Sequence, residues 1–178
     1  MIKRGVERKD GVEILCWRIE VPDLSEHEGI PSFLGEIAER TAAFCASALR
    51  KNAEERYDAF GDPKKRFRYP PLVYKLTVET VEESPELLSC ELTVSLGQGG
   101  RGLFCRRFGL IFDRSDGTLL SPVEAARRRG VRHLPRSVRR TVGGVLLKDG
   151  RVFLEKGQNR ILFWSKKPKN IEKSLVNK

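Results

Sequence analysis

The run from Pro31 to Phe60 most constrains the fold, because its apolar side chains recur every three or four positions. Charged side chains occupy the remaining arcs, so the run predicts one long amphipathic helix. Proline suits the first turn of a helix, and Gly61-Asp62-Pro63 is a typical stop. We expect the apolar stripe to pack in the core; its members are Phe33, Leu34, Ile37, Ala38, Phe44, Cys45, Ala48 and Leu49.

Apolar side chains alternate with polar ones on both sides of this helix. The pattern has period two over residues 12–21, 72–81, 88–96 and 104–112, which predicts half-buried strands. The last three follow one another through short connections, and short connections join antiparallel neighbours. The predicted fold class is therefore α+β, with an antiparallel meander sheet packed on the long helix.

A second, short helix is predicted near the end of the strand region. Ser121-Pro122-Val123-Glu124 spells a capping box with proline at the first helical position, and Gly130 follows as a stop. The helix is expected from about Pro122 to Arg129. Residues 145–154 then predict a hairpin around Asp149-Gly150, and residues 161–164 predict a last strand.

Composition favours one globular domain. With 178 residues, 39% of them hydrophobic and 33% charged, we expect a single domain over residues 1–164 and a basic, flexible tail over residues 165–178. No apolar run approaches the roughly 20 residues that span a bilayer, and no signal-peptide core follows the first residues. We therefore expect a cytoplasmic protein, unless the sequence was cut from a secreted or anchored parent. The sequence sets no oligomeric state.

Cysteine and histidine spacing predicts neither a metal site nor a cofactor. Cys16, Cys45, Cys90 and Cys105 lie far apart in apolar stretches, which predicts buried, reduced thiols. The glycine run 97–102 matches G-x-G-x-x-G, but a dinucleotide site needs a helix after it. A strand pattern follows instead, so the run predicts a hairpin connection.

No catalytic signature accompanies the two histidines, His27 and His133. The hypothesis is therefore that the protein is not an enzyme, although an active site assembled from distant segments stays open. A pocket that gathers either histidine with acidic or thiol groups within hydrogen-bond reach would favour an enzyme instead.

Arginine is concentrated between residues 127 and 140, a stretch without acidic residues. The guanidinium fork suits phosphate and carboxylate, so the cluster predicts an anion-binding surface. An acidic protein, an acidic polymer and nucleic acid remain open as partners, beside the alternative of a merely solvated surface. Smaller basic stretches lie at residues 64–69 and 166–169, and the net charge is +10. The candidate binding residues are Arg127, Arg128, Arg129, Arg132, Arg136, Arg139 and Arg140.

The stretch from about Tyr74 to Ala126 carries a family resemblance, through short motifs from residue 99 onward. They are Gly99-Gly100-Arg101-Gly102, Phe112-Asp113, Asp116-Gly117, Leu120-Ser121 and the run 144–150. Together they resemble a bacterial cell-envelope module found in lysozyme-sensing anti-sigma factors and beside the catalytic domains of peptidoglycan deacetylases.

The module's glycine motif reads Gly-Gly-Ala-His-Gly, whereas this chain is one residue shorter there and lacks the histidine. The resemblance implies the fold and a non-catalytic, protein- or ligand-binding character. The resulting hypothesis is a binding or sensor-like module for an anionic partner. The alternatives are a nucleic-acid-binding protein and an enzyme with a nonlocal site.

Overall fold

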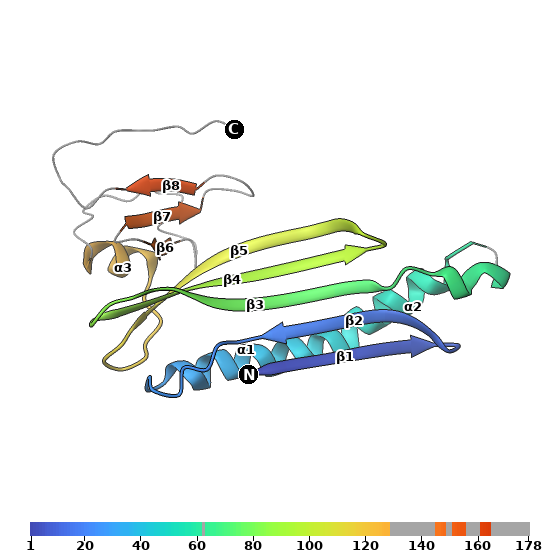
Figure 1. Ribbon diagram of the computed structural model, residues 1–178, viewed down its shortest axis with the longest axis horizontal. Coiled ribbons are helices and arrows are strands. Elements are labelled where there is room, and N and C mark those ends of the chain that lie inside the picture. The colour runs from blue at the N-terminus through green and yellow to red at the C-terminus, as the bar shows by residue number, and fades with distance from the viewer. Residues whose placement is uncertain (62, 129–144, 149–150, 156–160, 165–178) are drawn as a thin grey trace. The chain divides into compact units, whose positions relative to one another are not determined.

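The structure is a computed structural model that describes residues 1–61, 63–128, 145–148, 151–155 and 161–164. It confirms the α+β class: a mostly antiparallel five-stranded sheet accompanies one long helix and one short helix (Figure 1). The strand order in this sheet is β1-β2-β3-β4-β5. Within the described residues, no helix combines the length and the apolar character needed to cross a membrane.

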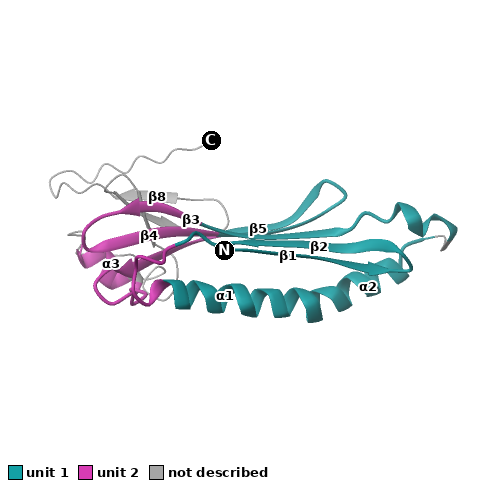
Figure 2. Ribbon diagram, turned by 60° about the horizontal axis from the view of Figure 1, so that its bottom comes forward, with its two compact units in different colours: residues 1–23, 31–78, 93–106 teal, residues 24–30, 79–92, 107–178 magenta. Residues whose placement is uncertain are grey.

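The chain forms two compact units, coloured separately in Figure 2. Unit 1 comprises Met1–Asp23, Pro31–Val78 and Thr93–Arg106, and unit 2 comprises the remaining segments. The prediction of a single domain over residues 1–164 stays a prediction. The predicted tail at 165–178 lies outside the described residues.

Unit 1 begins with a strand that the sequence analysis missed. Strand β1 (Ile2–Lys9) pairs antiparallel with β2 (Val12–Glu20). The turn between them is Asp10-Gly11, with φ of 52° and 76°, as two-residue hairpins require. The hydrophobic period does not indicate β1, because the alternate residues that this strand half-buries are mostly charged and not apolar. The local signal of the hairpin in the sequence is the Asp-Gly pair.

The long helix has three parts: α1 (Ile30–Phe44), a π-helical segment (Cys45–Leu49) and α2 (Arg50–Asp58). It follows one face of the unit 1 strands (Figure 2). The predicted stripe is corrected in its second half, where Phe44 is 46% exposed and Ala48 is exposed. From the start of the π-helical segment onward, the buried positions are instead Cys45, Leu49, Ala53 and Tyr57.

The pairing of β2 with β3 (Leu72–Glu83) corrects the predicted all-antiparallel sheet, because these two strands run parallel. The helix lies between them in the chain, and a long helical crossover is the usual connection between parallel strands. The predicted meander holds for β3, β4 (Leu87–Gln98) and β5 (Arg101–Asp113). Gly99 and Gly100, with φ of 57° and 79°, form the turn before β5 and confirm the hairpin interpretation.

The core of unit 1 lies between the helix and the sheet. Tyr57 from α2 is 2% exposed and meets the Tyr69 ring edge-on at 5.4 Å between centroids. Burying an aliphatic or aromatic side chain of this size contributes about 1.5–3 kcal/mol. The cluster consists of Ile14, Leu15, Cys45, Leu49, Ala53, Tyr57, Tyr69 and Leu72.

Unit 2 contains the short helix α3 (Pro122–Arg128), as predicted. The Ser121 hydroxyl accepts from the Glu124 amide at 3.3 Å, and the Glu124 carboxylate accepts from the Ser121 amide at 3.0 Å, which confirms the capping box. Strands β6 (Val145–Lys148), β7 (Arg151–Glu155) and β8 (Ile161–Trp164) form a second, antiparallel sheet, again at the predicted positions.

Candidate functional site

The arginine cluster is described only at its beginning. Arg127 is exposed in the last turn of α3. Arg128 instead pairs with Asp113, Nη2 to Oδ2 at 2.6 Å, so its charge is already compensated. The other candidates lie outside the described residues: Arg129, Arg132, Arg136, Arg139 and Arg140.

Asp113, the last residue of β5, holds the turn that follows it. Its Oδ1 accepts hydrogen bonds from the Ser115 hydroxyl at 2.7 Å and the Ser115 amide at 2.9 Å. These bonds, together with Arg128, lower the pKa of the Asp113 carboxyl to about 2. The carboxylate is therefore ionised at neutral pH and joins the turn to α3.

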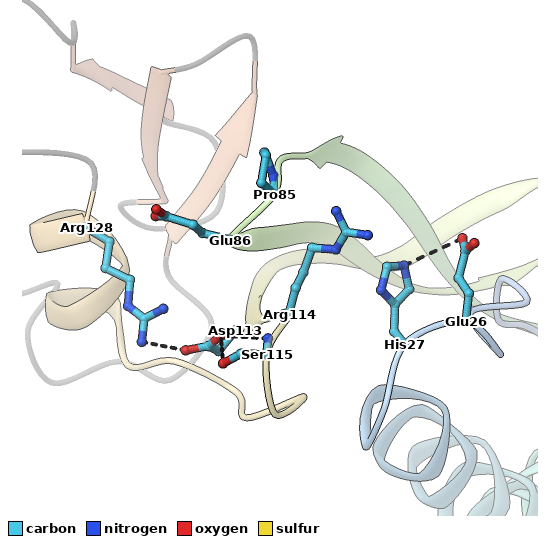
Figure 3. Close-up of a pocket in the computed structure, with 8 residues that line it drawn as sticks. All are labelled: Glu26, His27, Pro85, Glu86, Asp113, Arg114, Ser115 and Arg128. Atoms are coloured by element: carbon cyan, nitrogen blue, oxygen red, sulfur yellow. Dashed lines mark hydrogen bonds and ion pairs between the residues drawn. The ribbon is translucent and has the colours of Figure 1, made fainter.

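A cavity of about 430 Å³ opens beside this turn, entirely within unit 2 (Figure 3). His27 lies at its wall, with its side chain 3% exposed and its Nε2 without a hydrogen-bond partner. Nε2 is 3.7 Å from Glu26 Oε1 and 3.9 Å from Glu83 Oε1. The cavity is lined by Glu26, His27, Pro85, Glu86, Asp113, Arg114, Ser115 and Arg128.

An enzyme would be favoured by a pocket that holds a histidine within hydrogen-bond reach of acidic or thiol groups, and this cavity meets that condition only in part. It gathers His27 with acidic groups, but both distances exceed hydrogen-bond reach. The Ser115 hydroxyl donates to Asp113, so it is engaged in the turn. The second histidine, His133, lies outside the described residues.

Two glycines fix the loop that carries His27. Gly29 and Gly117 have φ of 74° and 70°, in the region that side chains disfavour. A Cβ on Gly117 would stand 2.0 Å from the Glu28 carbonyl oxygen, and one on Gly29 would stand 3.0 Å from the Asp116 carbonyl oxygen. The loop before α1 and the turn after β5 thus touch through backbone atoms, which places His27 at the cavity.

A second candidate surface is the first half of β5, Arg101–Arg106, here named the basic edge. Every residue in it is exposed, and β5 is the last strand of the sheet. Leu103 is 49% exposed and Phe104 is 38% exposed, although the sequence pattern placed Phe104 on the buried face with Leu110 and Phe112. The pattern misled because β5 becomes buried only from Gly109 onward.

The turn before the basic edge is held by hydrogen bonds to Tyr69 and Pro70, at the end of the basic stretch 64–69. The Gln98 amide donates to the Tyr69 hydroxyl at 3.0 Å and to the Pro70 carbonyl at 3.1 Å. The stretch itself forms a 3-10 helix, Pro63–Arg68, in which Phe67 is 67% exposed. Tyr69, by contrast, is buried in the core. The third basic stretch, 166–169, lies outside the described residues.

The thiols correct the prediction of four buried cysteines in part. All four are free, but only Cys45 and Cys90 are buried, while Cys16 is half-buried and Cys105 is exposed on the basic edge. Burial raises the pKa of Cys45 and Cys90 to about 11. These two are thiols rather than reactive thiolates at neutral pH.

Comparison with known proteins gives little. No protein-family model matches the chain, and no curated protein matches it. Among solved structures, it is similar to a DUF3298 family protein from Pseudomonas aeruginosa, with 17% identity and a TM-score of 0.41. The match covers 86% of this chain and 81% of that one. Similarity at this level assigns neither a family nor a function.

Proposed function

We propose that this chain is a non-catalytic binding module that receives an acidic, extended segment of a partner protein along the basic edge. The observation that carries the proposal is the exposure of Arg101–Arg106 on β5, an edge strand of the sheet. An edge strand presents backbone donors and acceptors, and an added strand can pair with them.

Side chains on the basic edge match such a partner. Arg101 and Arg106 supply positive charge, and no acidic residue interrupts the segment. Leu103 and Phe104 add apolar surface that exposed edges ordinarily avoid. Successive side chains of a strand point to opposite faces, so Arg101 and Leu103 share one face and Phe104 and Arg106 share the other. An added strand with acidic and apolar residues on each of its faces would therefore be complementary to the basic edge. The Arg127–Arg140 segment belongs to unit 2 and is proposed separately as an anion-binding region, with Arg127 and Arg128 as its described members.

Single-stranded nucleic acid is the second candidate, favoured by the exposed aromatics Phe67 and Phe104. Each ring, however, already has a guanidinium carbon 5.2 Å from its centroid, from Arg68 and Arg106 respectively. These cation–π contacts occupy one face of each ring, which reduces the aromatic surface left for stacking bases. This reduction makes the acidic protein segment the better candidate.

The non-catalytic part of the proposal is supported by three of the described thiols. Cys16, Cys45 and Cys90 all have raised pKa values. Raised values oppose nucleophilic activation. The proposal places the protein in the cytoplasm, where free thiols such as these four are kept reduced.

Fluorescence anisotropy with three labelled probes tests the proposal. The probes are a short peptide of Glu-Glu-Val-Val repeats, which places acidic and apolar side chains on both faces of a strand, its lysine counterpart, and oligo-dT of matched charge. The variant R101E/R106E reverses the basic edge. The control R40E/K51E makes the same charge change on exposed helix positions of unit 1.

The acidic peptide should bind the unaltered protein best, and R101E/R106E should weaken it at least about tenfold, since each charge pair contributes roughly a kcal/mol. R40E/K51E should change its Kd by less than about threefold. Equal losses in both variants would mean that only net charge matters. Tighter, steeply salt-dependent binding of oligo-dT would replace the proposal with the nucleic-acid candidate.

A further inference from the structure

Glu26, His27 and Glu83 of unit 2 converge on one point. One carboxylate oxygen from each glutamate and one imidazole nitrogen all lie within 4.8 Å of one another. Glu26 and His27 come from the loop before α1, and Glu83 is the last residue of β3. Figure 3 shows the Glu26 carboxylate facing the imidazole.

His27 is the part of this cluster that calls for a ligand. Its side chain is 97% buried, given its 3% exposure, yet Nε2 has no hydrogen-bond partner among the described atoms. Buried ring nitrogens are normally satisfied, because water can no longer compensate them. The carboxylate oxygens of Glu26 and Glu83, at 3.7 and 3.9 Å, are too distant for hydrogen bonds but are suitably placed to share a cation with the nitrogen.

We propose that Glu26, His27 and Glu83 bind a divalent transition-metal ion, with Zn²⁺ as the best match to one nitrogen and two oxygens. Tetrahedral ligands at about 2.0–2.1 Å from zinc stand about 3.3 Å apart. The two histidine–carboxylate distances must therefore shrink by only about half an ångström. Both glutamates are exposed enough to move, at 76% and 43%, while His27 stays fixed by its loop.

Arg114 and the cavity form the surroundings of this site. Arg114 Nη2 pairs with Glu83 Oε1 at 2.8 Å, and Arg114 Nη1 donates to the Ser84 carbonyl at 2.8 Å, so the Glu83 carboxylate is oriented. Because Oε1 already pairs with Arg114, Zn²⁺ must share this oxygen with the guanidinium or bind Oε2. Glu26 and His27 also line the cavity, which leaves an open side for water or an exogenous ligand. Local Cys/His spacing in the sequence could not indicate this site, because Glu83 is distant from Glu26 and His27 in the chain. This inference does not rest on the proposed function.

The test titrates Zn²⁺ into the full chain, stripped with EDTA, by isothermal titration calorimetry. Glu26→Gln, Glu83→Gln and His27→Gln should each weaken one-to-one binding at least about tenfold. Glu28→Gln, at an exposed neighbour, and His133→Gln are the controls and should match the unaltered protein. The two exposed glutamates keep the test valid even if His27→Gln fails to fold.

Co²⁺ absorption separates this site from the cysteines. Substitution at the proposed site should give d–d bands without thiolate charge-transfer bands. Absence of Zn²⁺ binding would overturn the proposal. So would equal affinity in all variants, or thiolate bands that disappear in Cys105→Ser.

Discussion

Replacing Gly117 by alanine should destabilise the protein more than the same change at Gly11. Both glycines have positive φ, 70° and 76°, so both variants incur the left-handed penalty of about 1–2 kcal/mol. Both also gain the same small entropic benefit, about 0.4–1 kcal/mol, from a less flexible unfolded chain. The difference lies in space, because a Cβ at Gly11 meets nothing within 4 Å.

At Gly117 the added Cβ would stand 2.0 Å from the Glu28 carbonyl oxygen and 2.9 Å from Gly29 Cα. Both obstacles are backbone, so the loop must move, and such overpacking costs about 1–3 kcal/mol. Gly117→Ala should therefore lose about 1–3 kcal/mol more than Gly11→Ala. Because the displaced loop carries His27, Gly117→Ala should also weaken the proposed Zn²⁺ site.

Urea unfolding followed by far-ultraviolet circular dichroism measures both free energies of unfolding by linear extrapolation. Amide exchange over Leu24–Ile30 reports locally whether the loop has opened. Equal losses in the two variants, with unchanged exchange in this loop, would refute the backbone contact between the loop and the turn after β5.

Three further outcomes follow from the described contacts. The free energy of unfolding should fall as the pH drops from about 5 to 2, because folding lowers the pKa of Asp113 from its ordinary value of 3.8 to about 2. Asp113→Asn should flatten this part of the stability profile, and an unchanged slope in the variant would contradict the role of Asp113. Ser121→Ala removes the capping box and should cost about 0.5–2 kcal/mol in urea unfolding, whereas no loss would mean α3 does not need its cap. Cys105 should react with a thiol reagent well before Cys45 and Cys90 in the folded protein, and simultaneous reaction would contradict their burial.

The sequence predicted those elements whose signals are local. Hydrophobic period, proline and glycine punctuation and the capping box at Ser121 identified the long helix, β2 to β5 and α3. It failed where burial depends on distant partners. The buried stripe differs from the π-helical segment Cys45–Leu49 onward, and the exposure of Phe104 arises because the first half of β5 lies at the sheet edge without cover among the described residues.

The candidate site could be predicted even less. The arginine count drew attention to residues 127–140, but the partner of Arg128 is Asp113, which no spacing in the sequence connects to it. His27 looked like a polar loop residue between two glutamates. Its burial results from the backbone contact of two glycines, and Glu83 reaches it from the end of β3. Such convergence is a property of the fold rather than of any local pattern.

Hydrogen exchange with the acidic peptide bound tests the central claim most directly. If the peptide adds a strand to β5, outward-facing amides within Arg101–Arg106 should exchange more slowly, because they donate to the added backbone. Amides of β1, the opposite edge of the sheet, should be unchanged. Protection confined to residues 127–140, with none at Arg101–Arg106, would contradict the claim and assign binding to the arginine segment alone.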